Sequence, residues 1–246
     1  MNADLIAGIG LTRLRVYEQR PAPDGAFCGC AHVHALTDEG YYVIAGEGAL
    51  ELHDLERGFR SVALRAGDYL QFPPGTLHRS VSTRGLEVLA VMGNSGLAEH
   101  GDARIYFGAD VDDDPERFAS LVALPRERGL EGALERRDAS IRAYADLINR
   151  WERDRTDYFA ELARFYAVHR HALTRRTADM ASAIRNGPGR WTERSEARLA
   201  ALGRGLDAGV RGAGDDIGAL KVSGIEAREV FGMCGVLTPL LQSERC

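Results

Sequence analysis

The 246-residue chain has almost no lysine and no long apolar run. Lys221 is the only lysine among 31 basic residues, and the net charge is −5 with arginine dispersed along the chain. That balance argues against a nucleic-acid-binding surface. No apolar stretch reaches the ~18 residues that span a membrane, and Met1–Asp4 lacks the basic segment that opens a secretory signal. We therefore expect a cytoplasmic protein without nucleic-acid or membrane partners.

Histidine is also scarce, yet three of the seven histidines fall in two short motifs. His32 and His34 are two residues apart, and such residues share a face when the backbone is a β-strand. Glu39 follows far enough behind for the chain to turn and begin a second strand. His78 comes after the turn predicted at Pro73–Gly75. This spacing predicts that three imidazoles and one carboxylate form a single metal site.

The two motifs resemble those of the cupin superfamily, a group of small β-barrels. The residues that match the family's motifs are His32, His34, Glu39, Gly46, Gly67, Pro73, Gly75 and His78. Ala26 stands where the family often has glycine, and Ser82 stands where it often has asparagine. Neither departure removes a ligand. The resemblance covers roughly residues 10–95.

By this resemblance, His32, His34, Glu39 and His78 are expected to be the ligands of one divalent metal, with two positions left for water, substrate or dioxygen. Imidazole and carboxylate do not discriminate strongly among metals, so manganese, nickel, zinc and copper would fit as well as iron(II). We favour iron(II), because relatives with three histidines and one glutamate are often dioxygenases. Glu39 is the candidate catalytic residue, since its carboxylate could accept a substrate proton.

Strand alternation also selects candidates for the wall of a substrate pocket. Counting in steps of two from Glu39 and His78 points Tyr41, Ser80 and Ser82 inward. His53 is a weaker candidate for the cavity. The predicted substrate-binding residues are Tyr41, Gln71, Ser80 and Cys30.

The four cysteines show neither zinc-site spacing nor a disulfide framework. They are Cys28, Cys30, Cys234 and Cys246. Alternation places Cys28 and Cys30 on the face of His32. Two interpretations stay open for this pair: a thiol near the metal, or packing as small apolar side chains.

Two regions of different character predict an α+β protein. Alternating stretches at residues 12–18, 49–53, 60–64, 69–72 and 86–92 predict strands, and residues 46–48 predict a turn. After Gly101 the chain carries the acidic run Asp110–Asp114, interpreted as a solvated linker, and then helical patterns. We expect a cupin β-barrel (jelly roll) over residues 1–109 and an all-α domain over residues 110–246.

Apolar residues define the expected helices. They recur at three- and four-residue steps from Leu130 to Trp151, with Arg137 as the one break, and again from Phe159 to Ile184. Joined near Asp154, the two stripes predict a helical hairpin or one bent helix, with His169 in its core. Residues 186–189 are expected to end the second stripe. Further helices are predicted over residues 192–206 and 224–237.

The favoured function is that of an oxidoreductase, a mononuclear non-haem iron(II) dioxygenase acting on a small-molecule metabolite, possibly of specialised metabolism. One alternative is Lewis-acid chemistry by an isomerase, decarboxylase or lyase with zinc, nickel or manganese. A second alternative is a non-catalytic module that binds a small ligand. The helical domain is expected either to form a homodimer or to cover the barrel mouth as a lid.

Overall fold

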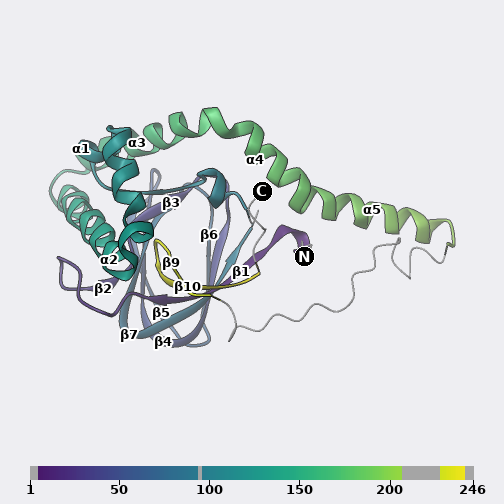
Figure 1. Ribbon diagram of the computed structural model, residues 1–246, viewed down its shortest axis with the longest axis horizontal. Helices are drawn as coiled ribbons and strands as arrows, with labels where there is room; N and C mark the ends of the chain where they lie inside the picture. Colours follow the sequence, from purple (N-terminus) through teal and green to yellow (C-terminus); the bar gives the residue numbers. More distant parts are fainter. Residues whose placement is uncertain (1–4, 94–95, 207–227, 242–246) are drawn as a thin grey trace.

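The structure is a computed structural model that describes residues 5–93, 96–206 and 228–241. Within these ranges one sheet of ten strands curls into a barrel (Figure 1). The strands are β1 (Gly10–Val16), β2 (Phe27–Cys28), β3 (His32–His34), β4 (Glu39–Asp54), β5 (Gly58–Arg65), β6 (Tyr69–Phe72), β7 (Leu77–Met92), β8 (Ala103–Ile105), β9 (Val230–Phe231) and β10 (Gly235–Leu241).

The long strands β4 and β7 form the frame of the barrel. They pair antiparallel from Glu39 opposite Met92 to His53 opposite Leu77, with register shifts between Val43 and Gly48. The first part of β4 also pairs with β6, and its second part pairs with β5. The turn predicted at residues 46–48 is therefore wrong, because these residues form bulges inside one strand.

Gly46 explains why the chain bends at these bulges without ending the strand. Its φ is 74°, and a Cβ atom there would lie 2.1 Å from the carbonyl oxygen of Gly85. Only glycine fits both the left-handed backbone and this close approach. The apolar interior of the barrel gathers on either side of the bend. Its buried residues are Leu14, Val16, Tyr41, Val43, Leu50, Leu52, Leu64, Phe72, Leu86, Val88, Ala90 and Cys234.

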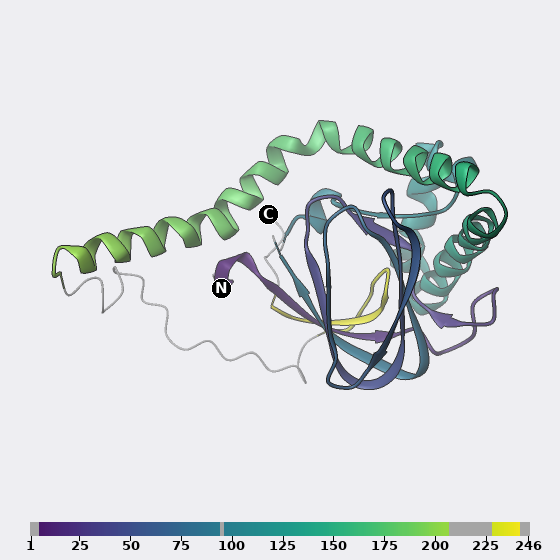
Figure 2. The same ribbon diagram turned by 180° about the vertical axis from the view of Figure 1, so that it is seen from behind.

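The helices follow the barrel in sequence and cover one side of it (Figure 2). They are η1 (Ile6–Gly8), η2 (Ala98–His100), α1 (Ala109–Asp112), α2 (Pro115–Arg153), α3 (Arg155–Leu173), η3 (Thr174–Arg176), α4 (Thr177–Ile184), the π-helical turn η4 (Arg185–Gly189) and α5 (Arg190–Gly203). The expected order of a β-barrel and then helices is thus confirmed, with an α+β fold. Among the described residues, no helix has the length and hydropathy needed to cross a bilayer.

The helical hairpin predicted around Asp154 is confirmed. Its carboxylate accepts hydrogen bonds from the backbone N–H groups of Thr156 and Asp157, which starts α3 where α2 ends. The apolar stripes of α2 and α3 pack against the barrel. The buried residues of this second core are Ala22, Cys28, Ala31, Val33, Leu77, Tyr106, Ile141, Tyr144, Leu147, Tyr158, Leu162 and Phe165.

Arg137, the break in the predicted apolar stripe, is fully buried. Its guanidinium donates to the carbonyl oxygens of Arg20 and Pro21 and to the carboxylate of Asp138. A buried guanidinium is tolerated when its donors are satisfied in this way. Arg137 therefore fixes the loop before β2 to α2.

Three expectations for the second half of the chain are wrong. Residues 186–189 do not end the helix, because η4 widens one turn around Pro188 and the chain continues into α5. The acidic run is not a solvated linker, because Asp112 is buried in α1 beside Arg104 and Arg164. The described part of the predicted helix at 224–237 forms β9 and the start of β10, since Gly232 and Gly235 flank a turn between strand-forming residues.

The C-terminal strand brings the end of the described chain back to the barrel. β10 pairs antiparallel with β1, with Leu14 opposite Leu237, and β9 folds back on β10. Residues 230–241 thus belong to the sheet and not to the helices that precede them. The division at residues 109 and 110 stays a prediction.

Two buried histidines should make the protein sensitive to acid. Burial, aided by Arg79, lowers the pKa of His53 to about 3, and burial lowers that of His169 to about 4. The hydroxyls of Tyr158 and Tyr144 lie 2.8 Å from Nδ1 and 2.7 Å from Nε2 of His53. The unfolded chain binds protons that these neutral imidazoles refuse. Stability is therefore complete above about pH 6.5 and falls by up to about 1.4 kcal/mol per pH unit per histidine below it.

Urea unfolding between pH 7 and pH 4 would measure this slope. The variant His53→Phe should be less stable at pH 7 but should lose less stability on acidification. The control His171→Asn changes an exposed histidine on α3 and should keep the slope of the unaltered protein. Equal slopes in all three proteins would contradict the assignment.

Candidate metal centre

Strands β3, β4 and β7 bring the four predicted ligands together inside the barrel. His32 on β3 pairs directly with His78 on β7, and Glu39 opens β4. One ligand atom of each of His32, His34, Glu39 and His78 lies within 4.8 Å of the corresponding atoms of the others. None of the four residues is more than 5% exposed. The spacing interpretation is correct in placing them at one point.

The hydrogen bonds of the three imidazoles set their tautomers. His32 Nδ1 lies 3.1 Å from the carbonyl oxygen of Cys30, and His78 Nδ1 lies 3.0 Å from that of Thr76. His34 Nδ1 lies 3.2 Å from a carboxylate oxygen of Asp102. Because each Nδ1 must donate to an oxygen, each Nε2 keeps its lone pair for the interior of the cluster.

Glu39 and His78 supply the observation that tests a metal. Glu39 Oε2 and His78 Nε2 are buried and have no hydrogen-bond partner among the described residues, although they lie 3.2 Å apart. Glu39 Oε2 also lies 3.6 Å from His34 Nε2. Ligand atoms about 2.1 Å from one ion are about 3.0–3.5 Å apart at angles of about 90–110°. The four residues therefore fit one divalent metal.

Buried charge points to the same kind of occupant. Burial raises the pKa of Glu39, but His78 and His34 outweigh it and lower the pKa overall. For Asp102, too, burial is outweighed by the hydrogen bond to His34, and its pKa is lowered. Burial, together with His78 and His34, lowers the pKa of His32 well below its ordinary value. Two buried carboxylates beside a neutral imidazole favour a divalent cation.

The candidate pocket residues have different outcomes. Tyr41 and Ser80 are buried as expected, and their hydroxyls have no hydrogen-bond partner among the described residues. Gln71 is wrong as a cavity residue, because it lies on the exposed face of β6, where its amide oxygen accepts from Tyr69. Ser82 donates to Glu18. His53 lies under the helices, as the bonds to Tyr144 and Tyr158 show.

Cys28 and Cys30 do not share the face of His32, because residues 29–31 interrupt the strand between β2 and β3. Cys28 belongs to the core beneath α2 and α3, and the side chain of Cys30 packs with Ile105 and Phe107. Both thiols therefore pack as small apolar groups. Cys30 reaches the cluster only through its carbonyl oxygen, which accepts from His32.

Two residues at the site carried no signal in the sequence. Asp102 comes directly after η2, and its carboxylate orients His34 and accepts the N–H of Leu36. Cys234 lies in the turn between β9 and β10, and its Sγ is 3.3 Å from His32 Nε2. Neither belongs to a motif, and both reach the cluster only through the tertiary fold.

The turn that carries Cys234 closes the cluster from solvent. Met233 O accepts the N–H of Cys30, while Gly232 O accepts from Tyr17 OH at 2.8 Å and from Arg136 on α2 at 2.6 Å. A Cβ atom at Gly29 would lie 2.5 Å from the carbonyl oxygen of Cys234. The β9–β10 hairpin therefore covers the cluster, with α2 holding its tip.

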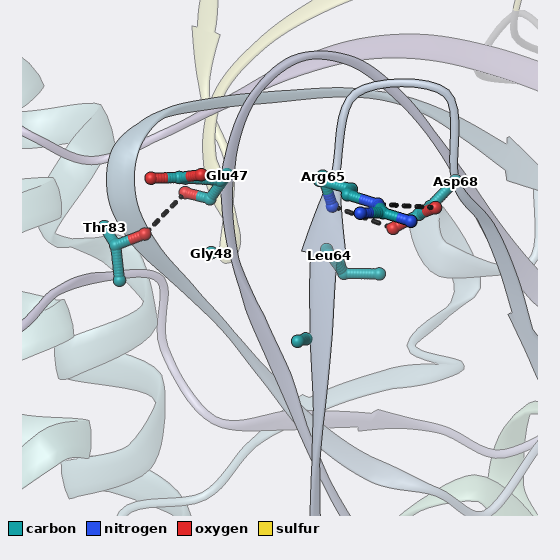
Figure 3. Close-up of a pocket in the computed structure, with 7 residues that line it drawn as sticks. Glu47, Gly48, Leu64, Arg65, Asp68 and Thr83 are labelled. Carbon is teal, nitrogen blue, oxygen red and sulfur yellow. Dashed lines mark hydrogen bonds and ion pairs between the residues drawn. The ribbon is translucent and has the colours of Figure 1, made fainter.

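A surface pocket of about 470 Å³ lies elsewhere on the barrel (Figure 3). It is lined by residues of the β4 bulge, β5 and β7 and includes the ion pair of Arg65 and Asp68. None of its lining residues belongs to the cluster of His32, His34, Glu39 and His78. It is thus not an entrance to the candidate metal site.

An antiparallel β-barrel with a buried cluster of three histidines and one glutamate is the class that the fold and the site define. Residues 19–92 match the cupin domain family. This part of the chain is therefore a cupin domain, and the predicted resemblance to the cupin superfamily is confirmed. No curated protein sequence matches the chain.

Solved structures align with about a third of the chain. A conserved protein of Klebsiella pneumoniae with a double-stranded β-helix domain is 17% identical over 38% of this chain and 70% of its own, with a TM-score of 0.29. The manganese-containing oxalate decarboxylase of Bacillus subtilis is 23% identical over 34% and 21%, with a TM-score of 0.28. A predicted oxalate decarboxylase of Thermotoga maritima is 27% identical over 33% and 63%, with a TM-score of 0.27. Such low scores say nothing about activity.

Metal content should depend on the cluster alone. We expect about one equivalent of divalent metal in the purified protein or after reconstitution, and none in the double variant His32→Ala, His78→Ala, which removes two of the four ligands. Mass spectrometry of the metals after desalting would measure this. The control His171→Ala should keep the metal. Equal metal content in the double variant would show that the ion binds elsewhere.

Proposed function

We propose that this protein is a metal-dependent enzyme, and specifically a mononuclear iron(II) dioxygenase that acts on a small-molecule metabolite. The observation that carries the proposal is the buried cluster in which every Nε2 is ready to bind and Glu39 Oε2 has no other partner among the described residues. Three imidazoles and one carboxylate leave two positions free on an ion with six ligands. Substrate and dioxygen together would need two.

In this proposal, Nε2 of His32, His34 and His78 and the carboxylate of Glu39 would hold the ion. Iron(II), when bound, supplies the one-electron chemistry that dioxygen requires. Asp102 keeps His34 in the binding tautomer, and Phe72 packs on the His78 ring with centroids 4.6 Å apart. These contacts keep the ligand atoms in place before any substrate arrives.

The remaining residues act on the substrate. Glu39, whose pKa is lowered by His78 and His34 despite its burial, is ionised and can accept a substrate proton at Oε2. The hydroxyls of Tyr41 and Ser80 are available to orient a polar group of the substrate. The β9–β10 hairpin excludes water from the site, which protects reactive species during oxidation.

Oxygen uptake tests the reaction. Iron(II)-loaded protein, prepared anaerobically, should consume dioxygen when mixed with one member of a panel of electron-rich phenols, enols and thiols. Glu39→Gln should lower the rate at least about 100-fold, because the carboxylate and its proton-accepting oxygen are lost. His171→Ala should keep the rate. Turnover with zinc, nickel or manganese without oxygen would replace this proposal by Lewis-acid chemistry, and binding without turnover would replace it by a ligand-binding module.

The helical part of the chain is proposed to form a homodimer through α5. The apolar stripes of α2 and α3 are already buried against the barrel, whereas α5 extends away from it in both views (Figures 1 and 2). Leu199 and Leu202, one turn apart on α5, are 70% and 50% exposed. A second copy of the helix would bury this pair.

Light scattering after size-exclusion chromatography would report the mass. We expect a dimer at micromolar concentration and a monomer for Leu199→Glu, Leu202→Glu, because two carboxylates cannot be buried in an apolar contact without partners. The control Leu55→Glu changes a leucine of similar exposure in the β4–β5 turn and should stay dimeric. A monomeric unaltered protein would refute the interface.

A further inference from the structure

The β9–β10 hairpin brings a thiol to the candidate metal centre from 202 positions along the chain. Cys234 Sγ lies 3.3 Å from His32 Nε2 in the interior of the barrel. Cys28 and Cys30, the other described cysteines, belong to the packed cores around the barrel. Cys234 is thus the described cysteine whose sulfur contacts a residue of the cluster.

The tautomer of His32 decides what this contact means. Its Nδ1 donates to the carbonyl oxygen of Cys30, so Nε2 carries a lone pair and the thiol of Cys234 donates to it. A metal bound at Nε2 would take that lone pair, and the sulfur would lose its acceptor. The thiol would then have to turn away or bind the same ion.

The backbone around Cys234 favours the second outcome. The turn is held on both sides, by Met233 O bonded to the N–H of Cys30 and by Gly232 O bonded to Tyr17 and Arg136. The carbonyl oxygen of Cys234 lies so close to Gly29 that a Cβ there would be 2.5 Å away. The hairpin tip therefore has little freedom to withdraw the sulfur.

The distance agrees with two atoms bound to one ion. Metal–nitrogen bonds of about 2.1 Å and metal–sulfur bonds of about 2.3 Å place nitrogen and sulfur about 3.1 Å apart at about 90° and about 3.6 Å apart at about 109°. The observed 3.3 Å falls between these values. Glu39 Oε2 and His78 Nε2, which are buried and without partners among the described residues, independently indicate an ion in the same space.

We propose that Cys234 is a fifth protein ligand of the metal, bound as a thiolate. On binding, the S–H bond breaks, a metal–sulfur bond forms and the proton passes to solvent, with no change of oxidation state. The C-terminal hairpin is then attached to the metal itself, and one of the two free positions is filled. A thiolate also favours iron, cobalt or zinc over manganese, which prefers oxygen ligands. This inference rests on the metal centre of the proposed function and is independent of the reaction.

Cobalt(II) gives a direct readout, because thiolate ligation produces an intense charge-transfer absorption in the near ultraviolet that nitrogen and oxygen ligands do not produce. The full-length protein loaded with one equivalent of cobalt should show this band. Cys234→Ser should still bind cobalt through His32, His34, Glu39 and His78 but should lose the band. The matched control Cys28→Ser removes another buried thiol and should keep it.

X-ray absorption of the unaltered, zinc-loaded protein supplies a test that needs no variant, since one sulfur neighbour at about 2.3 Å should be present. Cobalt bound without the band, a band that survives Cys234→Ser, or a shell of nitrogen and oxygen alone would overturn the assignment while leaving the metal centre intact. Failure to bind any metal would overturn both the centre and the inference.

Discussion

The bend of the β4–β7 pair is the constraint on which the site depends. Glu39 begins β4, whereas His78 pairs with Leu52 near the other end of that strand. In a straight strand these thirteen steps would separate the two residues by about 40 Å. Their ligand atoms lie 3.2 Å apart because the bulges between Val43 and Gly48 fold the pair over on itself. A barrel without these bulges would hold the same residues and no cluster.

Local rules explain why the cluster could be predicted from the sequence. Alternation places His32 and His34 on one face, and the Pro73–Gly75 turn delivers His78 to a new strand. Each step spans only a few residues. The same rules failed at Gly46, where glycine allows a bulge as readily as a turn, and at Cys28 and Cys30, where three residues outside any strand reset the alternation. Local pattern does not distinguish these outcomes, because the paired strand decides between them.

Long-range contacts explain what could not be predicted. Asp102 and Cys234 meet their histidines across 68 and 202 positions, and no spacing rule connects them. The end of the chain shows the same limit. Residues 230–241 pair with β1 at the other end of the sequence, and Pro239, which cannot donate a ladder bond, faces Thr12 beside a register shift. A helix predicted there from its start signal gave way to the edge that β1 offers.

The helices influence the site through the hairpin and not by covering the ligands themselves. Arg136 on α2 holds Gly232 O, two residues from Cys234, and the neighbouring Arg137 holds the loop before β2. Access to the buried cluster therefore requires movement of the hairpin tip, and that movement must break the bonds from Tyr17 and Arg136. Since hydrogen bonds to a charged group each contribute about 1.5–3 kcal/mol, α2 sets part of the barrier to opening. A change in the helix–barrel packing would thus alter substrate entry without touching a ligand.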